Sequence, residues 1–413
     1  MKNKILLLIA DGLGDRPCEA LAWKTPLEAA RKDHLNAIAQ NGSCGIMDLH
    51  ECGTPVGTDL GHMILFGYQY DDYPGRGPIE AFGEHIALKE GDIAFRANFA
   101  TVDENGIVID RRAGRIREGT KELAALLTGI EVDGVEVTFK EATEHRVVLV
   151  LRGPGLSATI TDTDPKEEGK PIKSAKAILV SDEARRTADV LNRVLEICRE
   201  RLANAPINQE RIKNGQLPAN CILTRGAGQM PNLRKMTDQY GFSGACVAGE
   251  STVLGVAFMA GFDIVTHPEM TGNIDTNIRM KAKLAVEALQ DHDFVCLHFK
   301  ATDLMGHDNN PLGKVKAIEK YDEMVGYVEE YLREIKDFNV ILALAADHST
   351  PCERREHSGD PVPIVISGKN IRKDRVQEYD EIHCAEGGLN RMNGHMFNRM
   401  LLDYLEVVPK KGN

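Results

Sequence analysis

Three apolar runs, one at the start of the chain and two in its last third, each lead into an aspartate. KILLLIA (residues 4–10) precedes Asp11, DFVCLHFK (293–300) lies shortly before Asp303, and NVILALAA (339–346) precedes Asp347. Runs of this length and composition are typical of strands buried in a parallel sheet. Ligands of open α/β sheets bind at the carboxyl ends of the strands, so the runs predict a site built at that edge.

The segments around two of these aspartates carry the residue types of a divalent-metal site. ATDLMGHDNN, ADHSTP and REHSGDP together contain Asp303, His307, Asp347, His348 and His357. A single metal usually takes three or four protein ligands. Five candidates therefore favour two ions about 3.5–4 Å apart, the arrangement that clamps a transferring phosphoryl group. Taken singly, Asp347 with His348 also fits a solvated loop.

A hydroxyl residue stands at a position suited to phosphate chemistry. In GTPVGTDLGHMILFGY, the glycines and proline predict a tight turn, and the apolar pattern from Leu60 to Phe66 predicts a helix that starts at Thr58 or Asp59. Free N–H groups at a helix N-terminus favour phosphate, so Thr58 is a candidate nucleophile. On local pattern alone, Thr58 fits a helix N-cap and Asp11 a turn residue. Together with the Asp and His segments, both extend the predicted site.

Composition narrows the class of protein. A length of 413 residues with 42% hydrophobic residues predicts a globular enzyme of two domains. The net charge of −12 argues against nucleic acid or an anionic membrane as a partner, since both require a broad basic face. The nine cysteines include no CxxC pair, which predicts free thiols in a reducing cytoplasm. No run approaches the ~20 apolar residues of a membrane span.

The order of the expected elements predicts a doubly wound α/β fold. Strands are expected at 4–10, 244–247, 293–299, 340–346 and 362–367. Helices are expected at 26–40, 275–290 and 312–336.

The middle of the chain has a different pattern. From residue 92 onward, short β-rich runs occur with helical stretches near 118–128 and 182–203, which predicts a smaller inserted α+β domain. We therefore expect residues 1–91 and 219–413 to form a discontinuous metal-binding domain and residues 92–218 to form an inserted substrate-binding domain.

An arginine-rich motif lies near the start of this predicted insertion. IDRRAGRIR contains Arg111, Arg112, Arg115 and Arg117 in an otherwise acidic protein. Guanidinium groups match the oxygens of carboxylate and phosphate. A solvated helix start paired with Glu118 is the alternative interpretation.

These motifs occur in segments that resemble the archaeal-type, cofactor-independent phosphoglycerate mutases of the alkaline phosphatase superfamily. The resemblance covers nearly the whole chain. In chain order, the matching segments are IADGLGDRP, GTPVGTDLGH, GRGPIEAFG, EGDIAFRANFAT, DRRAGRI, HRVVLVLRG, DTDPKEEGKP, RGAG, TGNIDTN, KATDLMGHDNN, ADHSTPCERREHSGDPVP and GGLNRMNGH.

The resemblance implies an alkaline-phosphatase-like core that interconverts 3-phosphoglycerate and 2-phosphoglycerate through phosphorylated Thr58. It implies one metal held by Asp11, Thr58, Asp347 and His348, and another held by Asp303, His307 and His357. The implied substrate-binding residues are Arg111, Arg112 and Arg115, with His145, Arg146 and Arg225 as further candidates. Mn²⁺ is the first choice of metal, with Co²⁺, Zn²⁺ or Mg²⁺ as alternatives. No 2,3-bisphosphoglycerate is expected, the partner is a small phosphorylated substrate, and homo-oligomer formation is left open.

Two positions depart from the family pattern. Thr58 stands where most members have serine, and Leu254 stands where a lysine that contacts phosphate is expected. The β-methyl group of threonine stiffens χ1 and crowds an in-line approach. A diverged metal-dependent phosphatase, a phosphonate hydrolase or a phosphotransferase to another alcohol therefore stays an alternative, and a metal-binding regulatory protein is an alternative of another class.

Overall fold

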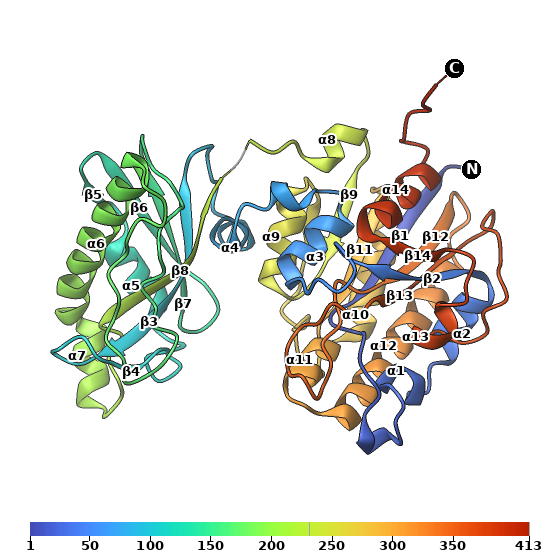
Figure 1. Cartoon of the computed structure of the whole chain (residues 1–413), viewed down its shortest axis with the longest axis horizontal. Helices are drawn as coiled ribbons and strands as arrows, with labels where there is room; N and C mark the ends of the chain where they lie inside the picture. Colours follow the sequence, from blue (N-terminus) through green and yellow to red (C-terminus); the bar gives the residue numbers. More distant parts are fainter. Residues whose placement is uncertain (231, 413) are drawn as a thin grey trace. The chain divides into compact units, whose positions relative to one another are not determined.

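The chain forms two units, each with its own sheet, in a computed structural model that describes residues 1–230 and 232–412 (Figure 1). Unit 1 comprises Met1–Tyr73 and Arg234–Asn413, and unit 2 comprises Pro74–Leu233. The predicted fold class, an α/β core with a smaller α+β domain, is confirmed.

Unit 1 is built on an eight-stranded sheet with the order β10-β9-β11-β1-β12-β13-β2-β14. Its strands are β1 (Asn3–Ala10), β2 (Gly42–Asp48), β9 (Gly244–Val247), β10 (Asp263–Val265), β11 (Phe294–Phe299), β12 (Asn339–Ala345), β13 (Val362–Ser367) and β14 (Asn390–Asn393). The strands from β10 to β12 are parallel, whereas β13 runs antiparallel to β12 and β2. The apolar residues Ile5–Ala10 of β1 are fully buried, as expected for a central strand with both faces covered.

The helices of unit 1 connect these strands. They are α1 (Pro26–Ala29), α2 (Asp33–Gln40), α3 (Thr58–Leu65), α8 (Met236–Tyr240), α9 (Ser251–Met259), α10 (Ile278–Ala288), α11 (Ala301–His307), α12 (Pro311–Leu332), α13 (Glu381–Cys384) and α14 (Gly394–Tyr404). The single helix expected at 26–40 is wrong, because Ala30 is extended (ψ 145°) and separates α1 from α2. The break accompanies burial of Lys32, whose Nζ lies 3.9 Å from Asp380 Oδ2. No helix within the described residues is long and apolar enough to cross a membrane.

Unit 2 contains a six-stranded antiparallel sheet. Its strands are β3 (Ile93–Val102), β4 (Val108–Asp110), β5 (Ile130–Val132), β6 (Val135–Glu141), β7 (Arg146–Arg152) and β8 (Cys221–Gln229). Its helices are α4 (Arg76–Gly83), α5 (Thr120–Leu127), α6 (Asp182–Ala203) and α7 (Pro206–Lys213). Apolar residues of the strands pack against apolar residues of α5 and α6 to form the core of this unit.

The boundaries of unit 2 differ from the predicted ones at 91/92 and 218/219. On the far side, β8 pairs with β3 along its length instead of returning to the main sheet. On the near side, α4 packs on β3 so closely that a Cβ added at Gly77 would lie 1.9 Å from the carbonyl oxygen of Ala94. Both elements therefore belong to the inserted unit, which the local sequence pattern could not reveal because strand pairing joins distant segments.

Candidate metal centre and arginine group

The three aspartates expected at strand ends lie together in unit 1. Strand β1 is paired in parallel with β11 and β12, with Ala10 opposite Phe299 and Ile9 opposite Ala345. The three strands therefore end at the same level. Asp11 follows β1 directly, and both Asp11 and Asp347 are fully buried.

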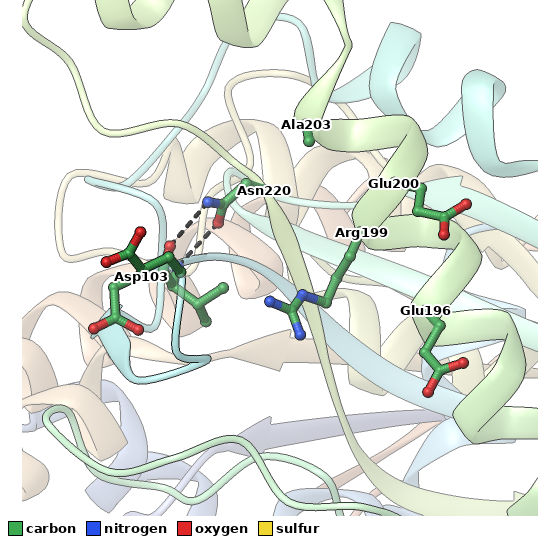
Figure 2. A pocket seen from close by; sticks show the side chains of 8 residues that line it. Asp103, Glu196, Arg199, Glu200, Ala203 and Asn220 are labelled. Atoms are coloured by element: carbon green, nitrogen blue, oxygen red, sulfur yellow. Dashed lines mark hydrogen bonds between the residues drawn. The ribbon is translucent and has the colours of Figure 1, made fainter.

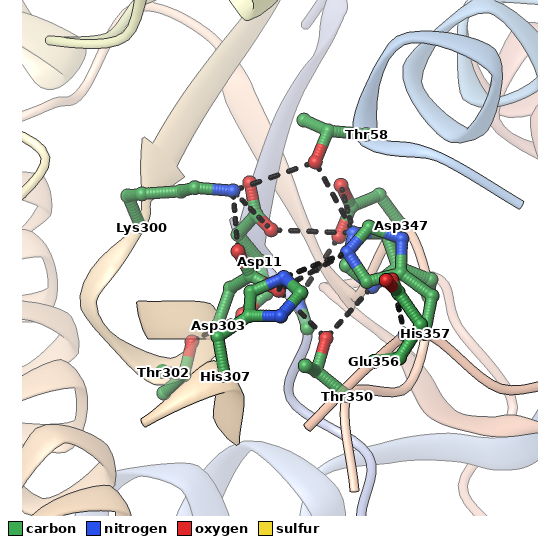
Figure 3. Close-up of polar contacts among 12 residues, drawn as sticks. Asp11, Thr58, Lys300, Thr302, Asp303, His307, Asp347, Thr350, Glu356 and His357 are labelled. Carbon is green, nitrogen blue, oxygen red and sulfur yellow. Dashed lines mark hydrogen bonds and ion pairs between the residues drawn. The ribbon is translucent and has the colours of Figure 1, made fainter. Parts of the chain in front are cut away.

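The predicted metal ligands form overlapping groups around these aspartates (Figure 3). In the first group, His348 Nε2 lies 3.4 Å from Asp11 Oδ1 and 3.3 Å from Asp347 Oδ2. In the second group, Asp303 and His357 join His348, whose ring stacks on that of His357 at 3.6 Å between centroids. His348 thus stands between the two groups.

His307 completes the second side of this centre. Its Nε2 lies 3.2 Å from His357 Nε2 and 3.4 Å from Asp303 Oδ1. Both rings donate Nδ1–H to backbone carbonyls, His307 to Arg355 and His357 to Val56. In the neutral rings, two Nε2 lone pairs therefore face one carboxylate oxygen, an arrangement that a cation satisfies.

Thr58 is the first residue of α3, as predicted, and reaches the same centre. Its Oγ1 lies 3.2 Å from His348 Nε2. Close packing of α3 permits this approach, since a Cβ at Gly61 would lie 2.4 Å from the carbonyl oxygen of Asp347. The glycine in TDLGH therefore brings the helix N-terminus to the strand edge.

Lys300 is a site residue that sequence reasoning missed. Its Nζ lies 2.7 Å from Asp303 Oδ2, 3.0 Å from Asp11 Oδ1 and 3.4 Å from Thr58 Oγ1. Burial disfavours the ammonium ion, but the carboxylates of Asp11 and Asp303 outweigh it and raise the pKa of Lys300. The sequence contained one signal for Lys300, because this residue directly follows the apolar run that forms β11. Lys300, and not residue 254, supplies the amino group beside Thr58.

Two buried histidines lie behind the aspartates. His298 Nε2 lies 2.9 Å from Asp11 Oδ2, and His62 donates Nδ1–H to the carbonyl of Thr58 at 2.8 Å while lying 3.3 Å from Asp347 Oδ2. Such contacts hold one oxygen of a ligating carboxylate and orient the other.

The charge balance of this centre fits divalent cations. Asp11, Asp303 and Asp347 are all buried, and within the described residues Lys300 is the only lysine paired with them. Asp347 Oδ2 has no hydrogen bond within the described part of the chain, although two imidazole nitrogens approach it. Carboxylate, imidazole and hydroxyl donors match Mn²⁺, Zn²⁺, Co²⁺ or Mg²⁺.

Unit 2 contains a group of arginines with the opposite imbalance. Arg96 of β3 lies opposite Arg225 of β8, and Asn98 of β3 lies opposite Arg146 of β7. Directly opposite residues of an antiparallel pair share one face of the sheet, where like charges destabilise it. We name Arg76, Arg96, Arg146 and Arg225 the arginine group.

Two members of the arginine group share one carboxylate. Glu80 Oε1 accepts from both Arg76 Nε (3.1 Å) and Arg96 Nη1 (3.0 Å). Within the described residues, the buried Nε atoms of Arg96 and Arg225, together with Asn98 Oδ1 and His145 Nδ1, have no hydrogen-bond partner. Burial and the neighbouring arginines lower the pKa of His145 to about 4, so this ring is neutral near pH 7.

The arginines of the DRRAGRIR segment do not act as one group. Arg111 forms a two-point ion pair with Asp164, at 3.0 and 2.6 Å. Arg112 is exposed, and its positive charge contributes to the lowered pKa of His145. Arg115 is exposed and lines a separate hollow with Arg117 and Arg211. The structure thus groups Arg146, Arg225 and His145 with Arg96, and sets Arg115 apart.

A further hollow of unit 2, about 490 Å³ in volume, contains none of the predicted site residues (Figure 2). Its lining includes four carboxylates and one guanidinium, from Asp103, Glu104, Glu196, Glu200 and Arg199. This acidic lining is unsuited to a phosphorylated substrate.

Comparison with known proteins places the chain in one family. The family model described as 2,3-bisphosphoglycerate-independent phosphoglycerate mutase matches residues 39–208. A mutase of this description from Methanocaldococcus jannaschii is 47% identical over 404 residues, 97% of each chain. Another from Methanopyrus kandleri is 45% identical and covers 100% of this chain and 99% of the relative.

Two solved structures agree with this result. The PH0037 protein from Pyrococcus horikoshii superposes with a TM-score of 0.84 at 36% identity, over 100% of both chains. The cofactor-independent phosphoglycerate mutase from Thermoplasma acidophilum superposes with a TM-score of 0.73 at 36% identity, covering 98% of this chain and 100% of that one. Full-length identity, a shared fold and the site geometry together make this chain a member of the 2,3-bisphosphoglycerate-independent phosphoglycerate mutases.

Proposed function

We propose that this enzyme interconverts 3-phosphoglycerate and 2-phosphoglycerate through a phosphothreonine at Thr58. The observation that carries the proposal is the hydroxyl of Thr58, at the N-terminus of α3 and 3.2 Å from His348 Nε2 among the clustered Asp and His side chains. The N-terminus of this helix and the nearby ammonium of Lys300 suit a phosphate group.

Two divalent cations, with Mn²⁺ as the first choice, would be held by the predicted ligands. One set comprises Asp11, Thr58, Asp347 and His348, and the other comprises Asp303, His307 and His357. When bound, such cations lower the pKa of the hydroxyl and offset the charge on the transferred phosphoryl oxygens.

Thr58 performs the covalent step in this scheme. Its Oγ1–P bond forms while the bond between phosphorus and the substrate oxygen breaks, and the proton lost by the hydroxyl ends on the leaving oxygen of glycerate. The second half reverses these changes on the neighbouring hydroxyl of glycerate. Lys300, 3.4 Å from Oγ1, would stabilise negative charge on the phosphoryl oxygens.

Glycerate must stay bound between the two half-reactions, because water would otherwise take the phosphoryl group. We assign its retention to the arginine group of unit 2, together with Arg111, Arg112 and His145. Within the described residues, the buried Nε atoms of Arg96 and Arg225 have no hydrogen-bond partner, so the carboxylate of the substrate would bond there. Arg115 has no support beyond its motif.

An assay of 3-phosphoglycerate with Mn²⁺, measuring 2-phosphoglycerate and free phosphate together, tests the proposal. We expect 2-phosphoglycerate as the main product without added 2,3-bisphosphoglycerate. Free phosphate as the main product would instead identify a phosphatase, the alternative suggested by Thr58 and Leu254.

A cytoplasmic location also stays a prediction; it is supported by the nine cysteines, all of them free thiols within the described residues.

A further inference from the structure

We propose that Thr350 is a positioning residue that joins the two halves of the metal centre through its side-chain hydroxyl. Thr350 Oγ1 lies 2.6 Å from Asp303 Oδ1 and 3.0 Å from His348 Nδ1 (Figure 3). These two residues belong to opposite sides of the metal site in the proposed function, on which this inference rests.

The directions of the two hydrogen bonds follow from chemistry. A carboxylate can only accept, so the single O–H of Thr350 donates to Asp303. The same oxygen must then accept from His348, which places a proton on Nδ1 of the ring. The neutral ring is left with its lone pair on Nε2, the atom that faces Asp11, Asp347 and Thr58. Thr350 therefore selects the tautomer of His348 that can bind a cation, and it also fixes the Asp303 carboxylate.

The surrounding backbone keeps Thr350 in place. Its side chain is fully buried between two glycines: a Cβ at Gly12 would lie 2.4 Å from Thr350 Oγ1, and a Cβ at Gly306 would lie 2.8 Å from Thr350 Cγ2. The backbone N–H of Thr350 donates to Gly14, and its carbonyl accepts from the buried Lys314 at 2.9 Å. The hydroxyl thus has one available position, as a pre-organised support requires.

The test compares Thr350→Ser with Thr350→Ala in the full chain. Serine retains the hydroxyl and loses the methyl group, whereas alanine loses both, so the difference isolates the hydroxyl. Binding of Mn²⁺ to metal-free protein is measured by calorimetry, and Co²⁺ titration is followed by visible absorption, which reports the ligand geometry. We expect Thr350→Ala to weaken metal binding about 10–100-fold and to change the Co²⁺ spectrum. Thr350→Ser should restore both.

Thr187 provides a matched control. It is a fully buried threonine of unit 2 whose hydroxyl donates to the carbonyl of Glu183 at 2.7 Å. Thr187→Ala should alter thermal stability without altering metal affinity or the Co²⁺ spectrum. If Thr350→Ala does not fold, Thr350→Val takes its place, because it retains the volume of the side chain without the hydroxyl.

Three results would overturn the inference: wild-type affinity and spectrum in the variant that lacks the hydroxyl, equal defects in the serine and alanine variants, or no divalent-metal binding by the wild-type protein. Isomerase activity is recorded separately. A wild-type protein that binds Mn²⁺ but does not isomerise phosphoglycerate would contradict the proposed function, and the comparison of serine with alanine would still decide the role of Thr350.

Discussion

The metal centre of unit 1 and the arginine group of unit 2 have opposite charge imbalances. In the first, three buried carboxylates outnumber the one lysine that pairs with them within the described residues, Lys300. In the second, the two guanidinium groups of Arg76 and Arg96 share Glu80. Each region also contains a buried polar atom that has no hydrogen bond in the part of the chain that the structure describes, Asp347 Oδ2 in one and Arg96 Nε in the other. Burying unbalanced charge costs stability, so a ligand of opposite sign would stabilise each region.

The largest expected effect concerns the nucleophile of unit 1. Thr58→Ala should reduce isomerase turnover by roughly 10⁴–10⁶-fold, because it removes the hydroxyl that is proposed to carry the phosphoryl group. Thr58→Ser should keep turnover, since the hydroxyl remains and the β-methyl group is gone. Mass spectrometry of a trapped phosphoenzyme provides the direct check. Phosphate on any residue other than Thr58 would contradict the mechanism.

Removing the cations tests the proposed role of the buried carboxylates in unit 1. Exhaustive chelation should reduce turnover by at least about 10³-fold, and Mn²⁺ should restore it. The thermal midpoint should also rise on adding Mn²⁺, because cations that bind only the folded state stabilise it. Full activity in protein whose measured metal content is zero would contradict the proposal that the clustered carboxylates bind cations needed for turnover.

Removing one arginine tests the basic side. Arg96→Met should raise KM for phosphoglycerate by about 10–100-fold, the loss expected for a hydrogen bond to a charged group. Glu80 keeps Arg76 as a partner in this variant. Mn²⁺ affinity should not change. Arg117→Met is the matched control, because Arg117 is exposed and pairs with Glu144. Equal KM values in the two variants would show that the arginine group has only a structural role.

The smallest effect concerns Glu381, a partly buried residue of unit 1 whose carboxylate has hydrogen-bond partners within the protein. Its oxygens accept from Asp15 N–H and from the hydroxyl of Thr25. Burial raises its pKa from 4.5 to about 7. Between these values the folded protein binds a proton that the unfolded chain releases, so stability falls as the pH rises from 4.5 to 7, by up to about 3 kcal/mol.

Glu381→Gln should remove this fall. Denaturant unfolding of both proteins at pH 5 and pH 8 measures it, and the difference between them cancels the contributions of other groups. Parallel pH profiles for wild type and variant would mean that Glu381 ionises normally in the fold.

The clustering of the Asp and His side chains was largely predictable from the sequence, and the arginine group was not. Asp11 and Asp347 directly follow apolar runs that are typical of buried strands. The carboxyl ends of parallel strands lie at the same edge of a sheet, so these aspartates are expected to lie close together. Arg96 lies inside a strand, and only the pairing of β3 with β8 places Arg225 opposite it. Pairing between distant segments has no local signal, which is also why the predicted boundary at 218/219 excluded β8. The roles of Lys300 and Thr350 were only partly predictable. Both residues lie within segments that the sequence analysis singled out, but their contacts depend on the direction of their side chains.

The discontinuity of unit 1 determines the order in which the two regions can form during synthesis. Unit 2 is one continuous stretch, so its sheet can close once β8 has left the ribosome. Strand β1 must wait for β11 and β12, its neighbours from the last third of the chain. Throughout that interval an apolar strand has two unpaired edges, the feature most prone to aggregation in a nascent chain. The sheet that carries the arginine group can therefore form early, whereas the apolar strand that leads to Asp11 is paired only near the end of synthesis.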